Sequence, residues 1–277
     1  MSTERLCALW HGGDLSYIEE LCLTSMVDTG HRVALYTYND VYNIPTGIDQ
    51  RDAREVMPEE KMLRHNRKGL GKGSFAIGSD IFRYLLLQKG LGCWVDCDML
   101  FLRPLPQSDY HFGWERPGSI CNAVLKLPID SPVLAATLAI AFSDQPVLPW
   151  WGPVKRRRNW LKGKIGIGRK VTELPWGAIG PKAITHFAVK QDIVSLASPF
   201  PVFYPNPPCL APDAFSATAN FKARLTPDTI AVHLWKTELK EAGVLEPQEG
   251  SWIDRQCDRL GIFKDQMEDH TQITLAV

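Results

Sequence analysis

The sequence has no excess of charge of either sign and no long apolar run. Lysine plus arginine and aspartate plus glutamate number 31 each, so no overall field favours nucleic acid, and such binding would need a local patch. No window contains the ~18 uninterrupted apolar residues typical of a membrane-spanning helix, and the opening residues MSTERLCALWHGGD lack the apolar stretch of a signal peptide. We therefore expect a cytoplasmic protein, with peripheral contact at the inner face of a membrane left open.

Disulfide frameworks, repeats and linkers are also missing. The seven cysteines are odd in number and scattered, at positions 7, 22, 93, 97, 121, 209 and 257. This usage argues against disulfides and for a reducing compartment. A length of 277 residues allows one large core or two small ones. Because no low-complexity linker divides the chain, we expect residues 1–277 to form one domain.

The first 40 residues follow a β-α-β pattern. Residues 5–10 and 33–38 are apolar runs that predict strands. Between them, Ser16 and Glu19 have the spacing of a capping box at a helix N-terminus. This order predicts a parallel sheet with a right-handed crossover.

Farther along, the pattern is mixed. Residues 45–73 read as irregular and polar, and residues 131–142 as a helix with proline at its first position. Strand and loop are expected at 194–204, and an apolar strand at 229–235.

The most informative stretch runs from Ser79 to Leu105 and reads as a helix, a glycine turn and a short strand. The helix is apolar on almost every side, which indicates burial, yet it carries Asp80 and Arg83 one turn apart. Buried charges need partners. Either the two form an ion pair, which contributes only ~0.2–0.5 kcal/mol on an exposed helix, or they bind sugar hydroxyls and phosphate.

The short strand, residues 93–95, ends on two aspartates. On an extended chain, side chains at i and i+2 share a face, so Asp96 and Asp98 should lie with Trp94 and away from the neighbouring cysteines, which disfavours a thiolate zinc site. Two carboxylates at the end of a buried strand suit Mn²⁺ or Mg²⁺, completed by water and substrate phosphate. The alternative is that Asp-x-Asp is an ordinary surface turn.

Two single residues have equally divided interpretations. His233, on the late apolar strand, is either a core histidine or a third metal or diphosphate ligand, since Mn²⁺ accepts imidazole. Trp10, at the end of the first strand, either stacks on a flat base or belongs to the core.

Residues 155–170 carry eight basic residues and no acidic one, with Trp160 among them. They could form a solvated helix face, a patch for anionic lipid or a lid over phosphates. Basic residues interspersed with tryptophan resemble interfacial anchors, while a solvated, mobile loop is the default expectation.

Taken together, the motifs resemble those of the retaining GT-A glycosyltransferases with an Asp-x-Asp sugar-binding region, a group related to α-1,4-galactosyltransferases, capsular polysaccharide transferases and the clostridial glucosylating toxins. The matching elements, in the family's order, are Leu9-Trp10-His11-Gly12, Ser79-Asp80-Ile81-Phe82-Arg83, the run from Gly90 to Asp98, Asn122, Gly180-Pro181 and His233-Leu234-Trp235. The chain departs from the pattern where Leu91 splits the glycine pair, Trp94 replaces a tyrosine and Ile179 replaces a threonine.

The resemblance implies an α/β, Rossmann-like nucleotide-sugar-binding fold, with a mainly parallel central sheet flanked by helices. Residues 1–125 would be the nucleotide-sugar-binding half and residues 126–277 the acceptor-side half. The implied activity is that of a metal-dependent retaining hexosyltransferase, moving a sugar from a nucleotide sugar, with UDP the expected nucleotide, to a free or lipid-linked glycan. Surface polysaccharide or lipopolysaccharide synthesis is the implied setting, with no nucleic-acid partner and with an anionic membrane surface as a further partner through residues 155–170.

The resemblance also implies residue roles. Asp80, Arg83, Asp96 and Asp98 would be catalytic. Asp96, Asp98 and His233 would hold Mn²⁺ (or Mg²⁺). The donor-binding set would be Trp10, His11, Asp80, Arg83, Asp96, Asn122, Gly180 and His233, with Trp10 beside the uracil.

Two other classes remain open. One is a catalytically weak nucleotide-sugar-binding protein on the same fold. The other is a membrane or nucleic-acid interaction module that acts through residues 155–170.

Overall fold

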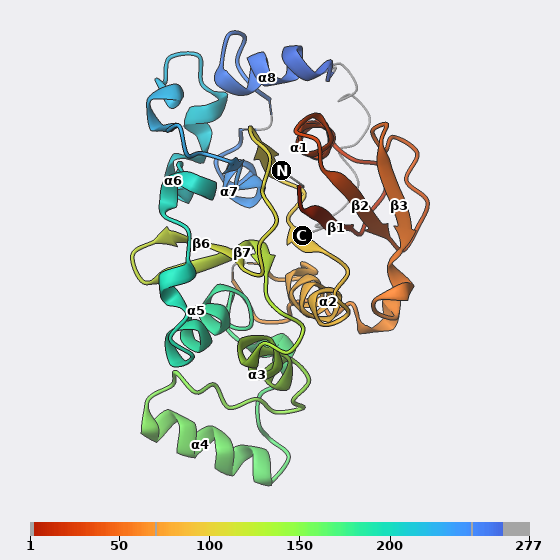
Figure 1. Cartoon of the computed structure of the whole chain (residues 1–277). Coiled ribbons are helices and arrows are strands. Elements are labelled where there is room, and N and C mark those ends of the chain that lie inside the picture. The colour runs from red at the N-terminus through yellow and green to blue at the C-terminus, as the bar shows by residue number, and fades with distance from the viewer. Residues whose placement is uncertain (1–2, 70, 245, 263–277) are drawn as a thin grey trace.

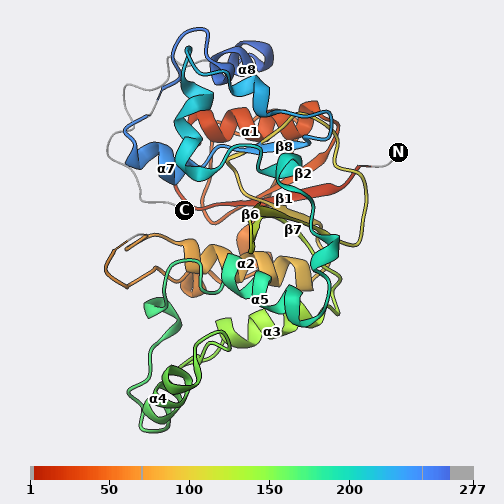
Figure 2. The same ribbon diagram turned by 90° about the vertical axis from the view of Figure 1, so that its left-hand side faces the viewer.

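The structure is a computed structural model that describes residues 3–69, 71–244 and 246–262. Within these residues, a six-stranded sheet runs through the centre, with helices on both faces (Figures 1 and 2). The strands are β1 (Arg5–Trp10), β2 (Arg32–Thr37), β3 (Ile48–Asp52), β4 (Cys93–Val95), β5 (Met99–Phe101), β6 (His111–Arg116), β7 (Ser119–Lys126) and β8 (Ala231–His233).

α-Helices alternate with the strands in the first half of the chain and dominate the second half. They are α1 (Tyr17–Asp28), α2 (Ala76–Gln88), α3 (Pro132–Ala141), α4 (Pro153–Lys164), α5 (Pro181–Lys190), α6 (Phe200–Phe203), α7 (Lys236–Glu241) and α8 (Trp252–Leu260). Short 3₁₀ helices connect them: η1 (Ala53–Glu55), η2 (Glu59–Lys61), η3 (Val171–Glu173), η4 (Val194–Leu196), η5 (Pro208–Phe215) and η6 (Phe221–Arg224). None of the described helices is both long enough and apolar enough to cross a bilayer.

The sheet order is β3-β2-β1-β4-β7-β6. Strands β3, β2, β1 and β4 are parallel, whereas β7 is antiparallel to β4 and forms a hairpin with β6. The predicted α/β class with a mainly parallel sheet flanked by helices is therefore confirmed. Separately, β5 pairs with β8 in an antiparallel two-stranded sheet.

The apolar character of β1 follows from burial on both faces, as expected for a central parallel strand. Leu6 and Ala8 point into a core shared with β2 and β5, while Cys7 and Leu9 point into a second core built around α2 and α3. Helix α1, which begins at the predicted capping box of Ser16 and Glu19, covers one face, and α2 covers the other (Figure 2).

A glycine sets the close approach of β4 to β1. Gly92 has φ +150°, and a Cβ at this position would lie 2.7 Å from the carbonyl oxygen of Arg5. A side chain here would push β4 away from β1. The chain can therefore enter β4 at Cys93 only because residue 92 has no side chain.

Three local predictions were wrong. The polar segment 45–73 contains β3, an edge strand that pairs only with β2 and exposes most of its side chains, so no apolar alternation marks it. Residues 194–204 form η4 and α6 rather than a strand. The basic segment 155–170 is mostly the helix α4, so the default expectation of a loop was wrong and the alternative of an exposed helix face was right. The C-terminal part of the described chain contains α7 and α8.

Candidate metal centre

The two aspartates lie in the turn that joins β4 to β5. The amide of Met99 donates to the carbonyl of Asp96 (3.2 Å), which reverses the chain directly after β4. Strand β5 then pairs with β8 so that Met99 lies opposite His233. As a result, the end of β8 meets the turn, and the amide of Leu234 donates to the carbonyl of Asp98 (2.9 Å).

This pairing brings together three side chains, which we call the Asp-Asp-His cluster: Asp96, Asp98 and His233. One potential ligand atom from each lies within 4.8 Å of those of the other two. His233 Nε2 is 3.2 Å from Asp98 Oδ1. The side chains of Asp96 and Asp98 keep 26% and 17% of their surface exposed, against 8% for His233, so an ion could reach the carboxylates from solvent.

The orientation of His233 is fixed by the residues that follow it. Its ring stacks on the ring of Trp235, with centroids 3.8 Å apart, and the Trp235 indole donates to the carbonyl of Asn206 (2.8 Å). Trp235 has φ 56° and ψ 53°, a left-handed conformation that costs roughly 1–3 kcal/mol for a residue other than glycine. The bend aims the next amide, that of Lys236, at Asp98 Oδ2 (3.1 Å).

The three side chains of the cluster shift one another's pKa values. Burial alone would raise the pKa of Asp98, but the charge of His233 and hydrogen bonds from His233 and Lys236 lower it to about 2. Burial opposes the charge on His233, yet Asp98 raises the pKa of that imidazole well above its usual value. Burial raises the pKa of Asp96, against the opposing effect of Arg83. His233 and Arg83 thus act on the two carboxyl groups in the direction opposite to burial.

The donor set fits a hard divalent cation. Two carboxylates and one imidazole suit Mn²⁺ and are compatible with Mg²⁺, and a bound ion would supply positive charge next to the two carboxylates. No thiolate takes part among the described residues, because Cys97 Sγ contacts the carbonyl of Leu9 (3.5 Å). The expectation that the cysteines point away from the carboxylates agrees with this contact.

A second group of polar side chains, which includes Asp80 and Arg83, lies next to the cluster. Its contacts show whether these two charges pair only with each other. Arg83 Nε is 3.5 Å from Asp80 Oδ1 and its Nη2 is 3.2 Å from Asp96 Oδ1. Its guanidinium also donates to the carbonyl of Asn122 and lies 4.8 Å from the centre of the Trp94 ring. Arg83 therefore bridges the helix aspartate and the cluster, and is more than a partner within its own helix.

Asp80 is held on several sides. Asn122 Nδ2 donates to Asp80 Oδ1 (2.8 Å). A Cβ on Gly180 would lie 2.9 Å from Asp80 Oδ2 and 3.2 Å from Asn122 Nδ2, so residue 180 must be small. Burial raises the pKa of Asp80 to about 6, although Arg83 and Asn122 act in the opposite direction.

Trp94 and Lys236 are site residues to which the sequence interpretation gave no role. The Trp94 indole donates to Asp96 Oδ1 (2.6 Å), which places it on the carboxylate side as the alternation predicted. Lys236 directly follows the His-x-Trp element, and that position was the available signal. Its Nζ pairs with Glu19 and lies 5.3 Å from the centre of the Trp10 ring.

The two N-terminal candidates lie in different surroundings. Trp10 is half-buried, donates to the carbonyl of Gly13 (2.6 Å) and is connected to Asp98 through Lys236. His11 instead packs on Phe75, with ring centroids 4.1 Å apart. Among the described residues, no recorded contact joins His11 to the Asp-Asp-His cluster.

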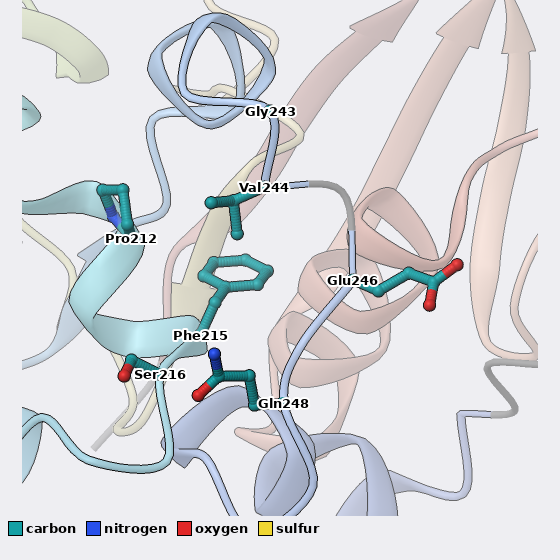
Figure 3. A pocket seen from close by; sticks show the side chains of 7 residues that line it. All are labelled: Pro212, Phe215, Ser216, Gly243, Val244, Glu246 and Gln248. Atoms are coloured by element: carbon teal, nitrogen blue, oxygen red, sulfur yellow. The ribbon is translucent and has the colours of Figure 1, made fainter.

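Two hollows among the described residues differ in their lining, since one is lined by a predicted site residue and the other is not. A small cavity beside Asp80 is lined by His65, Ala76, Ile77, Asp80, Val171, Leu174, Pro175, Trp176, Gly177, Ala178 and Ile179. A second hollow lies between η5 and the segment that leads to α8, where the Phe215 ring faces Val244 (Figure 3). Its lining residues are Pro212, Phe215, Ser216, Gly243, Val244, Glu246 and Gln248, none of which is a predicted site residue.

Fold and site together define an α/β protein with a candidate divalent-metal centre at the carboxyl end of β4. No protein-family model matches the chain, and no curated protein matches it significantly. A solved structure titled "PaToxG Glycosyltransferase" is similar over 68% of this chain and 68% of its own, with 12% sequence identity and a TM-score of 0.41. This likeness is distant and does not by itself assign a function.

Proposed function

We propose that this protein is a metal-dependent retaining glycosyltransferase of the GT-A class. It would transfer a hexosyl group from a nucleotide sugar, with UDP as the nucleotide, to a glycan acceptor in surface polysaccharide or lipopolysaccharide synthesis. The observation that carries the proposal is the direct connection, through Arg83, between the Asp-Asp-His cluster and the Asp80–Asn122 pair. The order of the sequence motifs supports the same function.

The cluster meets the electrostatic need of the reaction. Breaking a glycosyl–diphosphate bond builds negative charge on the leaving group and positive charge on the sugar. Bound Mn²⁺ or Mg²⁺ would supply charge stabilisation for the departing diphosphate. Asp96, Asp98 and His233 would hold the ion, with His233 locked by Trp235 and Asp98 held by the Lys236 amide.

The neighbouring polar group would recognise the donor sugar. Asp80 keeps one oxygen on Asn122, and its other oxygen faces Gly180, where the absence of a side chain leaves room for a hydroxyl. Arg83 is buried, and its guanidinium pairs with Asp80 and Asp96. It would therefore hold these two carboxylates in position. Trp10, next to Lys236, is suited to border the base, and we place His11 on the same side of the donor.

Retention of configuration needs no strong protein nucleophile in this scheme. The sugar passes through a short-lived oxocarbenium-like ion, and the departing phosphate takes the proton of the acceptor hydroxyl as the new bond forms. The pair of carboxylates that glycosidases place on either side of the sugar is not required.

We assign two halves to one catalytic domain from the positions of the strands. All strands of the six-stranded sheet lie between residues 5 and 126, which supports residues 1–125 as the nucleotide-sugar half. Residues 126–277 would form the acceptor side. We place the protein in the cytoplasm, with its basic segment 155–170 toward the inner face of the membrane.

The test is release of UDP from a panel of UDP-sugars by the purified chain, with Mn²⁺, with Mg²⁺ and with EDTA. Hydrolysis or transfer should require the divalent ion and should be lost in Asp98→Ala. The matched control is Asp109→Ala, because Asp109 is exposed and lies outside the site. Full activity in EDTA or in Asp98→Ala would rule out the metal role. Tight binding of a UDP-sugar without turnover on any acceptor would instead favour the nucleotide-sugar-binding protein.

A further inference from the structure

Helix α4 is almost uncovered by the other residues that the structure describes. Figures 1 and 2 both place it at one end of the molecule, beyond α3. Of its twelve residues, only Asn159 is buried, and Gly163 is half-buried. The chain after the helix is held by Gln145, whose side chain accepts a hydrogen bond from the Gly168 amide (2.8 Å). The helix is thus anchored along one narrow stripe and leaves its other faces to solvent.

The exposed faces carry charge of one sign. Residues 155–170 contain eight basic residues and no acidic one, while the whole chain is neutral. The remainder of the chain therefore carries an excess of eight acidic residues. A charge separation of this size orients the protein, because α4 is attracted to an anionic surface while the remainder is repelled from it.

The same faces carry large apolar side chains. Val154, Leu161 and Ile165 are 82%, 49% and 71% exposed. With Arg158 they follow an i, i+4, i+7, i+11 spacing, so they lie along one side of the helix and its C-terminal cap. Trp160 is also exposed, and the ammonium of Lys164 lies 5.4 Å from its ring centre.

We propose that α4 is an interfacial helix that docks this protein on anionic lipid bilayers, with Val154, Leu161 and Ile165 entering the boundary between headgroups and acyl chains. Helices that combine a basic face with exposed apolar and aromatic side chains bind in the plane of such a surface. The basic side chains are attracted to the anionic lipids, and their aliphatic stems can run along the surface while their charges stay in water.

The apolar stripe formed by Val154, Leu161 and Ile165 favours a bilayer over nucleic acid as the partner of α4. A phosphate backbone would use the lysines and arginines, but it offers nothing to an aliphatic row of valine, leucine and isoleucine. In water these side chains are better buried, and a bilayer buries them without the shape complementarity that a protein partner requires. The surface is separate from the Asp-Asp-His cluster, and the inference does not depend on glycosyl transfer.

The experiment measures co-sedimentation of the full chain with vesicles of phosphatidylcholine alone and of phosphatidylcholine mixed with phosphatidylglycerol. One variant, Arg157→Gln/Arg158→Gln/Lys162→Gln, removes three charges from α4 and keeps its helix propensity. The matched control, Arg67→Gln/Lys68→Gln/Lys72→Gln, removes three charges from the exposed loop before α2. A third variant, Leu161→Gln/Ile165→Gln, removes the apolar stripe and leaves the charge unchanged.

We expect wild type and the loop control to bind the anionic vesicles and not the neutral ones. The α4 charge variant should bind on the order of a hundredfold more weakly, since each lysine or arginine near such a surface contributes roughly fivefold. The stripe variant should lose on the order of tenfold or more. Circular dichroism establishes that each variant is folded.

Three results would overturn the inference. They are no binding of wild type to anionic vesicles, equal binding by the α4 charge variant, and unchanged vesicle binding by the stripe variant. If a labelled single-stranded oligonucleotide binds wild type more tightly than vesicles do, and the stripe variant binds it equally well, then α4 is a nucleic-acid surface instead.

Discussion

Asp80 should make the folded protein less stable as the pH rises, and Asp80→Asn should remove that effect. Burial raises the pKa of this carboxyl from 3.8 to about 6, so between these values the folded chain keeps a proton that the unfolded chain has lost. Stability therefore falls as the pH rises through this window. A difference of about 2.2 pH units corresponds to about 3 kcal/mol in total, of which about 2 kcal/mol lies between roughly pH 4.5 and 7.5.

Urea unfolding followed by tryptophan fluorescence measures this contribution as a difference between variants. Other carboxyl groups titrate in both proteins and cancel, so the stability of Asp80→Asn relative to wild type should increase by about 2 kcal/mol from about pH 4.5 to 7.5. The asparagine can still accept the Asn122 hydrogen bond, which preserves the local packing. If the free energies of unfolding of the two proteins change with pH in parallel, Asp80 is not protonated at mildly acidic pH and its pKa is not raised in the folded protein.

Two further changes probe the same network. Gly180→Ala should lower UDP release and should cost roughly 1–3 kcal/mol of stability in thermal unfolding, because its Cβ would lie 2.9 Å from Asp80 Oδ2. The control Gly152→Ala has open space around its Cβ and should change neither UDP release nor stability. Equal effects of the two would contradict the crowding argument. Arg83→Met should cost about 3–5 kcal/mol in urea unfolding, since it leaves buried carboxylates unpaired, while the exposed Arg103→Met should be nearly neutral. A loss below about 1 kcal/mol for Arg83→Met would mean that the aspartates do not depend on this guanidinium.

The sequence was sufficient for the parts of the fold that are locally encoded. The capping box at Ser16, the apolar runs of β1 and β2, and the glycine turn before β4 all lie where the pattern predicted them. Strand β3 was missed because an edge strand with one partner and exposed side chains has no apolar signature. Helix α4 was expected by default to be a loop because basic residues dominate its sequence and it lacks the wide apolar face of a buried helix.

Some residues of the candidate site were likewise predictable from local sequence patterns, whereas others depend on the tertiary fold. The spacing of Asp96 and Asp98 after a buried strand indicated a candidate metal site, and Asp80 with Arg83 indicated a charged pair in an apolar helix. The contact of Lys236 with Asp98 joins residues 138 positions apart and exists only because β5 pairs with β8. That pairing depends on the tertiary fold, so the sequence signalled Lys236 only by its position after the His-x-Trp element and could not show its contact with Asp98.

We propose that Asp96, Asp98 and His233 hold a divalent ion. The most direct measurement is Mn²⁺ binding to the purified chain, with and without UDP, by electron paramagnetic resonance of free Mn²⁺. We predict one bound ion per chain and at least ~10-fold weaker binding in Asp98→Ala, since loss of a ligand should cost no less than loss of an outer-shell partner, with Asp109→Ala unchanged. If wild type binds no Mn²⁺ in either condition, or if Asp98→Ala binds it as tightly as wild type, the three residues are not a metal centre.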